Sequence, residues 1–195
     1  MLIFGIILAG GMGRRMGGAD KALLDLAGRP LVAHVADRIG PQVAALAVSA
    51  NGDPARLAAL GLPVLPDDLS LGPLSGLLQG LRWAAGQGAT LLLSVPVDAP
   101  FLPGDLVPRL LMAGEGARPA LARSGGRVHP VCGLWPTGLA PALERFLASG
   151  AKARVMDFAT AHDAALADFP QDGAFSNLNT PEDLAHAEAL LKGCP

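Results

Sequence analysis

The stretch Leu2-Ile-Phe-Gly-Ile-Ile-Leu-Ala9, followed by Gly10-Gly-Met-Gly-Arg-Arg-Met-Gly-Gly18, decides the fold. Its apolar run from residue 4 to residue 9 is short and continuous and ends at glycines. Such a run is typical of a strand that is buried on both faces of a parallel sheet. The stretch therefore predicts a buried strand that leads directly into a glycine-rich loop.

Apolar runs and helical patterns alternate along the rest of the chain. Strands are predicted over 43–50, 63–65 and 90–97, an extended segment over 127–135, and helices over 30–39, 53–60, 73–85, 103–112, 137–148 and 180–191. Thr180 and Asp183 have the spacing of a capping box, and Pro181 stands at the first helical position. This alternation indicates an α/β fold with a doubly wound, mostly parallel sheet. No repeat or linker interrupts it, so we expect a single domain over residues 1–195.

The composition argues against several classes of protein. Hydrophobic residues make up 51% of the chain and charged residues 16%, and the mean hydropathy is +0.40. A membrane-spanning helix needs about 20 consecutive apolar residues, and no run approaches that length. The net charge of −2 argues against nucleic-acid binding. Cys132 and Cys194 have no metal or redox spacing, so we expect reduced thiols in a cytoplasmic protein.

The first loop has the composition of a phosphate-binding site. Gly10, Gly11 and Gly13 allow backbone N–H groups to converge on phosphate oxygens, and Arg15 and Lys21 add positive charge. The loop matches neither the dinucleotide fingerprint nor the P-loop. An ordinary glycine-rich turn is the alternative. The position after a buried strand and the scarcity of lysine, with three in the chain, favour phosphate binding.

Three further polar positions follow predicted strands. Asp98 comes after a long apolar run and can hold Mg²⁺ between nucleotide phosphates, or it can be a turn residue before Pro100. Asp67 or its neighbour Asp68 can accept hydrogen bonds from the N–H groups of a nucleotide base, although a solvated acidic turn is the simpler interpretation. Asn51 is by default a turn residue. Ligands of open α/β sheets bind at the carboxyl ends of the strands, where all these residues lie.

The segment from Leu8 to Lys21 resembles the signature of nucleotidyltransferases. In particular, it is similar to the pattern L-A-G-G-x-x-x-R-M-G-G-x-D-K of molybdenum cofactor guanylyltransferases. The resemblance continues along almost the whole chain. It includes Gly28-Arg-Pro-Leu31, Asn51, Pro66-Asp67, Gly72-Pro-Leu74, Pro96-Val-Asp98-Ala-Pro100, His129-Pro130 and Asn177-Leu-Asn-Thr-Pro-Glu-Asp-Leu184.

The resemblance implies a Rossmann-like nucleotidyltransferase that uses Mg²⁺ to transfer GMP from GTP to the phosphate of molybdopterin or the molybdenum cofactor, releasing pyrophosphate. It implies catalytic roles for Arg15, Lys21 and Asp98, with Asp98 as the metal ligand. The implied nucleotide-binding residues are Leu8, Ala9, Gly10, Gly11, Gly13, Lys21, Asn51, Asp67 and Asp98, and the implied pterin-binding residues are Arg15, Gly18, Asn177 and Asn179. Molybdenum-insertion proteins and molybdoenzyme chaperones are the implied protein partners.

Several alternatives stay open on the sequence alone. A cytidylyltransferase acting on the same cofactor is the nearest one, and a non-catalytic carrier of GTP or pterin belongs to a different class. Asn179 can cap the last helix without touching a ligand, and His129 can be purely structural. Trp83, Trp135, Ser75 and Ser94 are interpreted as structural residues.

Overall fold

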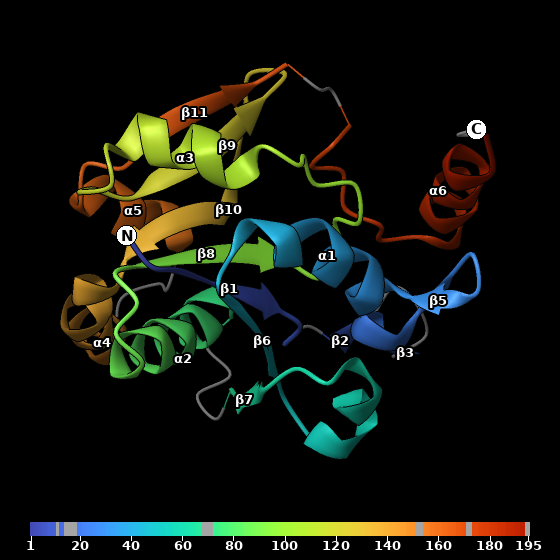
Figure 1. Ribbon diagram of the computed structural model, residues 1–195, viewed down its shortest axis with the longest axis horizontal. Helices are drawn as coiled ribbons and strands as arrows, with labels where there is room; N and C mark the ends of the chain where they lie inside the picture. The colour runs from blue at the N-terminus through green and yellow to red at the C-terminus, as the bar shows by residue number, and fades with distance from the viewer. Residues whose placement is uncertain (11, 14–18, 68–71, 151–153, 171–172, 194–195) are drawn as a thin grey trace.

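The computed structural model describes residues 1–10, 12–13, 19–67, 72–150, 154–170 and 173–193. A seven-stranded sheet forms its centre, in the order β11-β9-β10-β8-β1-β6-β7 (Figure 1). Its strands are β1 (Ile3–Leu8), β6 (Ala45–Ala50), β7 (Val64–Pro66), β8 (Leu91–Pro96), β9 (Ala120–Ser124), β10 (Arg127–Pro136) and β11 (Ala165–Phe169). β8, β1, β6 and β7 are parallel to one another, β11 is parallel to β9, and β10 is antiparallel to both of its neighbours. The predicted doubly wound, mostly parallel sheet is confirmed.

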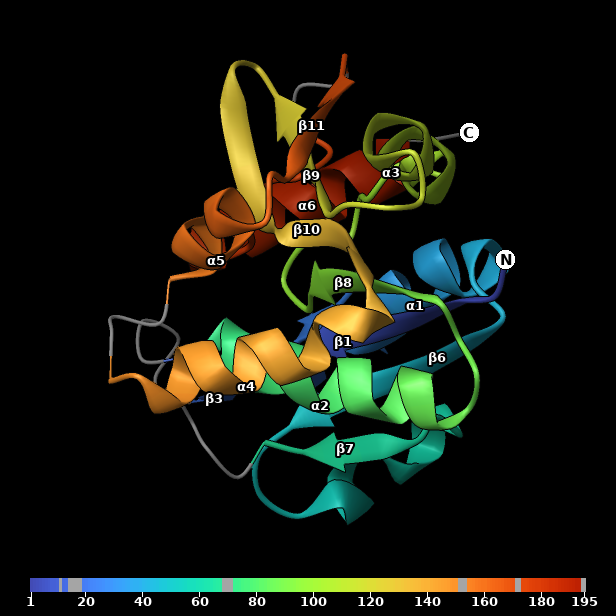
Figure 2. The same ribbon diagram turned by 90° about the vertical axis from the view of Figure 1, so that its left-hand side faces the viewer.

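Helices cover both faces of this sheet. The helices are α1 (Leu31–Ile39), α2 (Pro73–Gly86), α3 (Leu106–Gly114), α4 (Ala140–Ala148), α5 (Val155–Ala161) and α6 (Pro181–Gly193). Apolar residues of α1 and α3 share one core cluster with the sheet, and those of α2, α4 and α5 share the cluster on the other face. Figure 2 shows α2 and α4 lying side by side. α6 belongs to neither cluster and packs through Ala187 against Leu26 and Leu31.

Shorter elements surround the edge where β1 and β8 end. They comprise the hairpins β2–β3 (Met12–Gly13, Ala19–Asp20) and β4–β5 (Asp25–Leu26, Arg29–Pro30), and the 3-10 helices η2 (Lys21–Leu23) and η4 (Pro54–Leu60). Two further 3-10 helices, η3 (Gly40–Gln42) and η5 (Thr137–Leu139), adjoin the opposite edge, where β6 and β8 begin. In Figure 1, β1 and β8 point toward the side of the molecule that holds β3, β5 and α6. The loops from these strands therefore face the C-terminal segment.

α2 approaches the sheet unusually closely because two glycines face it. A Cβ at Gly80 would lie 2.9 Å from Leu92 Cδ2, and a Cβ at Gly76 would lie 2.7 Å from Ser49 Oγ and 2.9 Å from Leu8 Cδ2. Real Cβ atoms are not found at such distances. The two glycines therefore fix the height of α2 above β1, β6 and β8.

The sequence predictions differ from the structure at several elements. The helix expected over 103–112 begins only at Leu106, because residues 103–105 form a turn. The helix expected over 53–60 is the 3-10 helix η4, and the one expected over 137–148 begins with the 3-10 helix η5 before α4. Strands β9 and β11 and helix α5 were not predicted, since each has only five to seven residues and too short a hydrophobic pattern. Among the described residues, none of the helices combines the length and apolar character needed to cross a membrane.

Candidate active site

The loops that follow β1, β6, β7 and β8 meet at one edge of the sheet, because these strands are parallel. They enclose a cavity of about 260 Å³. The predicted site residues in its wall are Leu8, Gly10, Asp67, Asp98 and Asn177, and the other lining residues are Ser49, Gly72, Pro73, Gly76, Pro96, Val97 and Val131. Five of the predicted site residues thus line one cavity at the edge where open α/β sheets bind their ligands.

Two buried acceptors, one in the cavity wall and one beside it, bond to none of the described residues. A Cβ at Gly10 would lie 3.1 Å from Asp67 Oδ2 and 3.8 Å from Asn51 Nδ2, so these three predicted residues lie together. Asp67 is only 7% exposed. The Oδ1 atoms of Asp67 and Asn51 are both buried without a hydrogen-bond partner among the described residues. An unsatisfied buried acceptor costs about 1–3 kcal/mol, which a ligand with N–H or O–H donors would offset.

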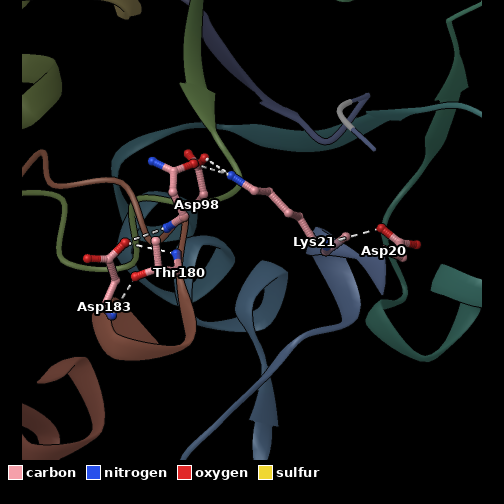
Figure 3. Close-up of polar contacts among 7 residues, drawn as sticks. Asp20, Lys21, Asp98, Thr180 and Asp183 are labelled. Atoms are coloured by element: carbon pink, nitrogen blue, oxygen red, sulfur yellow. Dashed lines mark hydrogen bonds and ion pairs between the residues drawn. The ribbon is translucent and has the colours of Figure 1, made fainter. Parts of the chain in front are cut away.

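Asp98, in the wall of the same cavity, is in contact with Lys21 (Figure 3), and Lys21 also contacts Asn179. Lys21 Nζ donates to Asp98 Oδ2 at 2.8 Å and to Asn179 Oδ1 at 2.6 Å. The side chains of Lys21 and Asp98 are 16% and 13% exposed, so solvent screens this ion pair only partly. The ammonium group therefore connects a predicted metal ligand to a predicted pterin-binding residue.

Lys21 is positioned by the start of η2. Asp20 caps this 3-10 helix, accepting from the Ala22 backbone N–H at 3.1 Å. Asp20 also pairs with Arg56 Nη1, and Arg56 Nη2 donates to the Asn51 carbonyl at 2.6 Å. The base of Lys21 is thereby linked to the loop that follows β6.

The donor set around Asp98 suits Mg²⁺. Asp98 Oδ1 is buried and has no hydrogen-bond partner among the described residues. The described residues contain no cluster of three or more His, Cys, Asp or Glu side chains that could enclose a metal. Mg²⁺ commonly binds through one or two carboxylates together with substrate phosphates and water. A single carboxylate oxygen that bonds to none of the described residues, on a side chain in the cavity wall, fits this mode.

The C-terminal segment is tied to the end of β8. The Leu178 backbone N–H donates to the Asp98 carbonyl at 2.9 Å, which places Asn177 and Asn179 beside the cavity. The backbone N–H groups of Asn179 and Thr180 donate to Asp183 Oδ2 at 2.8 and 2.9 Å. Asp183 N–H donates in return to Thr180 Oγ1 at 3.1 Å, so the predicted capping box is confirmed. These backbone donors hold the pKa of the Asp183 carboxyl below its usual value.

A second, more polar cavity of about 480 Å³ adjoins the first, and Asn177 lines both. Asn179 and Asp183 lie in the wall of the second cavity, and its other lining residues are Ser124, Gly125, Arg127, His129, Gly173, Phe175 and Ser176. The predicted pterin-binding residues Asn177 and Asn179 therefore line a separate space, which Asn177 shares with the first cavity. β9 and β10 supply its opposite wall, which sequence reasoning did not identify.

His129 combines a structural and a lining role. Its ring stacks on Phe175 with centroids 4.6 Å apart, and its Nε2 lies 2.8 Å from Ser124 Oγ. Burial, together with the charge of Arg127, lowers the pKa of the His129 imidazole. The pairing of β10 with β9 is irregular between His129 and Gly133. Within this stretch His129 lines the second cavity and Val131 lines the first.

The remaining predicted residues divide into two groups. Ala9 is buried and its N–H donates to the Ser49 carbonyl at 2.8 Å, while Gly13 pairs with Ala19 in the small β2–β3 hairpin. Gly11, Arg15, Gly18 and the second candidate aspartate, Asp68, lie outside the described residues. Their assigned roles stay predictions.

Sequence reasoning missed Ser49. This residue lines the first cavity, and its Oγ is buried without a hydrogen-bond partner among the described residues. A signal did exist, because Ser49 is a polar residue near the carboxyl end of an otherwise apolar strand.

Comparisons with known proteins agree with this geometry. The model of the MobA-like NTP transferase domain matches residues 5–165. A molybdenum cofactor guanylyltransferase from Cereibacter sphaeroides is 65% identical over 192 residues, which is 98% of each chain. Another, from Acidiphilium cryptum, is 50% identical over 187 residues, covering 94% of this chain and 93% of its own.

A solved structure has the same fold. Molybdopterin-guanine dinucleotide biosynthesis protein A from Archaeoglobus fulgidus superimposes with a TM-score of 0.74 at 21% identity, covering 98% of this chain and 99% of that one. The parallel strands, the cavity at their carboxyl ends and the match over most of the sequence lead to one assignment. The chain belongs to the MobA-like NTP transferase family.

Proposed function

We propose that this protein transfers GMP from GTP to the terminal phosphate of molybdopterin, or of its molybdenum-loaded form, and releases pyrophosphate. The observation that carries the proposal is the Lys21 bridge between Asp98 and Asn179, where two cavities meet. A transferase needs two adjacent substrate sites, and this contact lies between them. The names of the relatives support guanylyl transfer in particular.

The nucleoside of GTP fits the end of the first cavity that holds Asp67. The Asp67 carboxylate can accept from both the N1–H and the 2-amino group of guanine, which adenine does not offer together. Its buried Oδ1, which bonds to none of the described residues, supports this role, because a ligand donor would satisfy it. Asn51 Oδ1 offers a second acceptor on the same side. The triphosphate then extends toward Lys21.

Asp98 is the proposed Mg²⁺ ligand. When bound there, Mg²⁺ would stabilise negative charge on the phosphates of GTP. Asp98 contributes its Oδ1, to which none of the described residues bonds, and the Leu178 N–H fixes the backbone of Asp98 by donating to its carbonyl. Lys21 lies close enough to offset further charge on the phosphates.

The second cavity is the proposed site of the acceptor. Asn177 and Asn179 can read the donor and acceptor groups of a pterin edge, and Arg127 can pair with an anionic group. An oxygen of the acceptor phosphate attacks the α-phosphorus of GTP, and the bond to the β-phosphate oxygen breaks. Because this oxygen is already anionic near neutral pH, the protein needs no strong general base. Positioning and charge stabilisation therefore supply the catalysis.

The cytoplasmic location and the protein partners, namely molybdenum-insertion proteins and molybdoenzyme chaperones, stay predictions.

The test is to incubate the purified protein with molybdopterin, Mg²⁺ and each nucleoside triphosphate in turn, and to measure released pyrophosphate. We expect release with GTP and little with CTP or ATP, and none without molybdopterin. Asp98→Asn, which keeps the side-chain shape, is the matched inactive control. Preference for CTP would identify a cytidylyltransferase instead. Binding of GTP and pterin without pyrophosphate release would identify a carrier.

A further inference from the structure

Ser49 differs from the other buried hydroxyl residues among the described parts of the chain. Four other serine and threonine side chains are buried, and each of their hydroxyls has a hydrogen-bond partner. They are Ser75, Ser94, Ser124 and Thr137. Ser49 is 1% exposed, and its Oγ has no hydrogen-bond partner among the described residues. A buried hydroxyl without a partner destabilises the free protein, and alanine would fill the same position without that cost. A partner that is not part of the described structure, such as a ligand, would explain why a hydroxyl is present at this position.

The position of Ser49 places it on the same face of the sheet as Asp67. Ser49 pairs with Leu65 in the parallel register of β6 and β7, and Asp67 follows two residues after Leu65. Since side chains alternate between faces, Ser49 and Asp67 both face the α2 side. Two residues along a strand span about 6.6 Å, which is comparable to the width of a purine. Both residues line the first cavity.

α2 leaves room beside this hydroxyl because residue 76 is glycine. A Cβ there would lie 2.7 Å from Ser49 Oγ, so any larger residue would cover the hydroxyl. Gly76 itself lines the cavity, together with Gly72 at the start of the helix. Rotation about the Cα–Cβ bond of Ser49 can redirect its hydroxyl without moving the backbone.

The chemistry of Ser49 complements that of Asp67. The ionised carboxylate of Asp67 can only accept hydrogen bonds, whereas the hydroxyl of Ser49 can donate one. The Watson–Crick edge of guanine presents two donors, N1–H and the 2-amino group, beside one acceptor, O6. A carboxylate and a hydroxyl on one wall match this pattern. Adenine presents an amino donor in place of O6, so the hydroxyl can no longer donate there, and it presents an acceptor in place of N1–H, which the carboxylate cannot pair with.

From these observations we infer that Ser49 is a specificity-determining residue for the base, donating its hydroxyl to guanine O6 while Asp67 accepts from the donors of the same edge. The inference rests on the proposed function, since it takes GTP as the nucleotide. It adds a second base-reading group to the carboxylate that the sequence predicted.

The test compares Ser49→Ala with Ser94→Ala, a change of the same size at a buried, partnered serine on β8. Ser94 Oγ donates to the Val131 carbonyl at 2.7 Å and accepts from Trp135 Nε1 at 2.9 Å. Titration calorimetry without molybdopterin measures the binding of GTP, ITP and ATP in the presence of Mg²⁺. Urea unfolding of the nucleotide-free proteins measures stability.

We expect Ser49→Ala to weaken GTP and ITP binding by on the order of tenfold, because both bases carry O6, and to leave ATP binding unchanged. The same variant should unfold at an unchanged or higher urea concentration than the wild type. Ser94→Ala should do the opposite, unfolding at lower urea with GTP affinity unchanged.

Three results would overturn the inference: unchanged GTP affinity in Ser49→Ala, equal weakening of GTP, ITP and ATP, or a loss of stability that reveals an internal partner for the hydroxyl. Failure of the proposed function has a different signature. In that case the wild type would release no pyrophosphate with molybdopterin, while the effect of Ser49→Ala on GTP binding could still be measured.

Discussion

Replacing Lys21 by methionine tests the centre of the proposed site, because it removes the ammonium group and keeps most of the side-chain volume. In the free protein, Lys21 Nζ lies 2.8 Å from Asp98 Oδ2, and both side chains are less than one-fifth exposed. If Asp98 holds Mg²⁺ and Lys21 contacts phosphate, the substitution should affect the two ligands in opposite directions. GTP should bind more weakly, and Mg²⁺ alone should bind more tightly.

The magnitude follows from the kind of contact that is lost. A hydrogen bond to a charged group contributes about 1.5–3 kcal/mol, which corresponds to about 10- to 150-fold in affinity. We expect a loss of that size for GTP. Without Lys21, the Asp98 carboxylate also lacks its counter-charge, so the free protein should be destabilised by about 1–3 kcal/mol. Added Mg²⁺ should recover part of this loss, because a ligand that binds only the folded state stabilises it.

Titration calorimetry with GTP and thermal unfolding over a range of Mg²⁺ concentrations measure both effects. Lys192→Met is the matched control, since Lys192 lies on α6 with its side chain 72% exposed and pairs with Glu188 on the same helix, at 3.6 Å. The control should behave like the wild type in both assays. Unchanged GTP affinity in Lys21→Met would show that Lys21 is not a phosphate ligand. An unfolding temperature that responds to Mg²⁺ as in the wild type would show that Lys21 does not compete with the metal at Asp98.

Three further predictions concern the fold and the chemistry. Asp98→Ala should abolish pyrophosphate release from GTP and molybdopterin, and turnover near the wild-type rate would refute its role as metal ligand. Gly80→Ala should destabilise the protein by about 1–3 kcal/mol in urea unfolding, because its Cβ would lie 2.9 Å from Leu92 Cδ2; an unchanged midpoint would show that α2 can shift at no cost. The pKa of Asp183 is lowered in the folded state, so its stabilising effect should be complete at neutral pH and be lost as the pH falls through that lowered pKa. The difference in unfolding free energy between the wild type and Asp183→Asn should therefore shrink on acidification, and a difference independent of pH would contradict the capping box.

Local patterns predicted much of the fold. The buried strand β1, the long strand β8 and helix α2 have hydrophobic patterns that are strong without tertiary context. The capping box at the start of α6 was predicted because its hydrogen bonds join residues only three positions apart. Helix α5 was missed, because a seven-residue pattern does not distinguish a helix from a loop.

The sequence by itself determined the parallel sheet, the glycine loop after its first strand and the presence of Asp67, Asp98 and Asn179 after apolar or extended segments. These follow from periodicity, from turn chemistry and from a motif that is continuous in the chain. Only the tertiary structure decided that Lys21 pairs with Asp98 and Asn179, residues 77 and 158 positions away. It also decided that Asn177 lines two cavities and that the Ser49 hydroxyl has no partner among the described residues. Contacts between distant residues depend on strand order and helix packing, which no local pattern encodes.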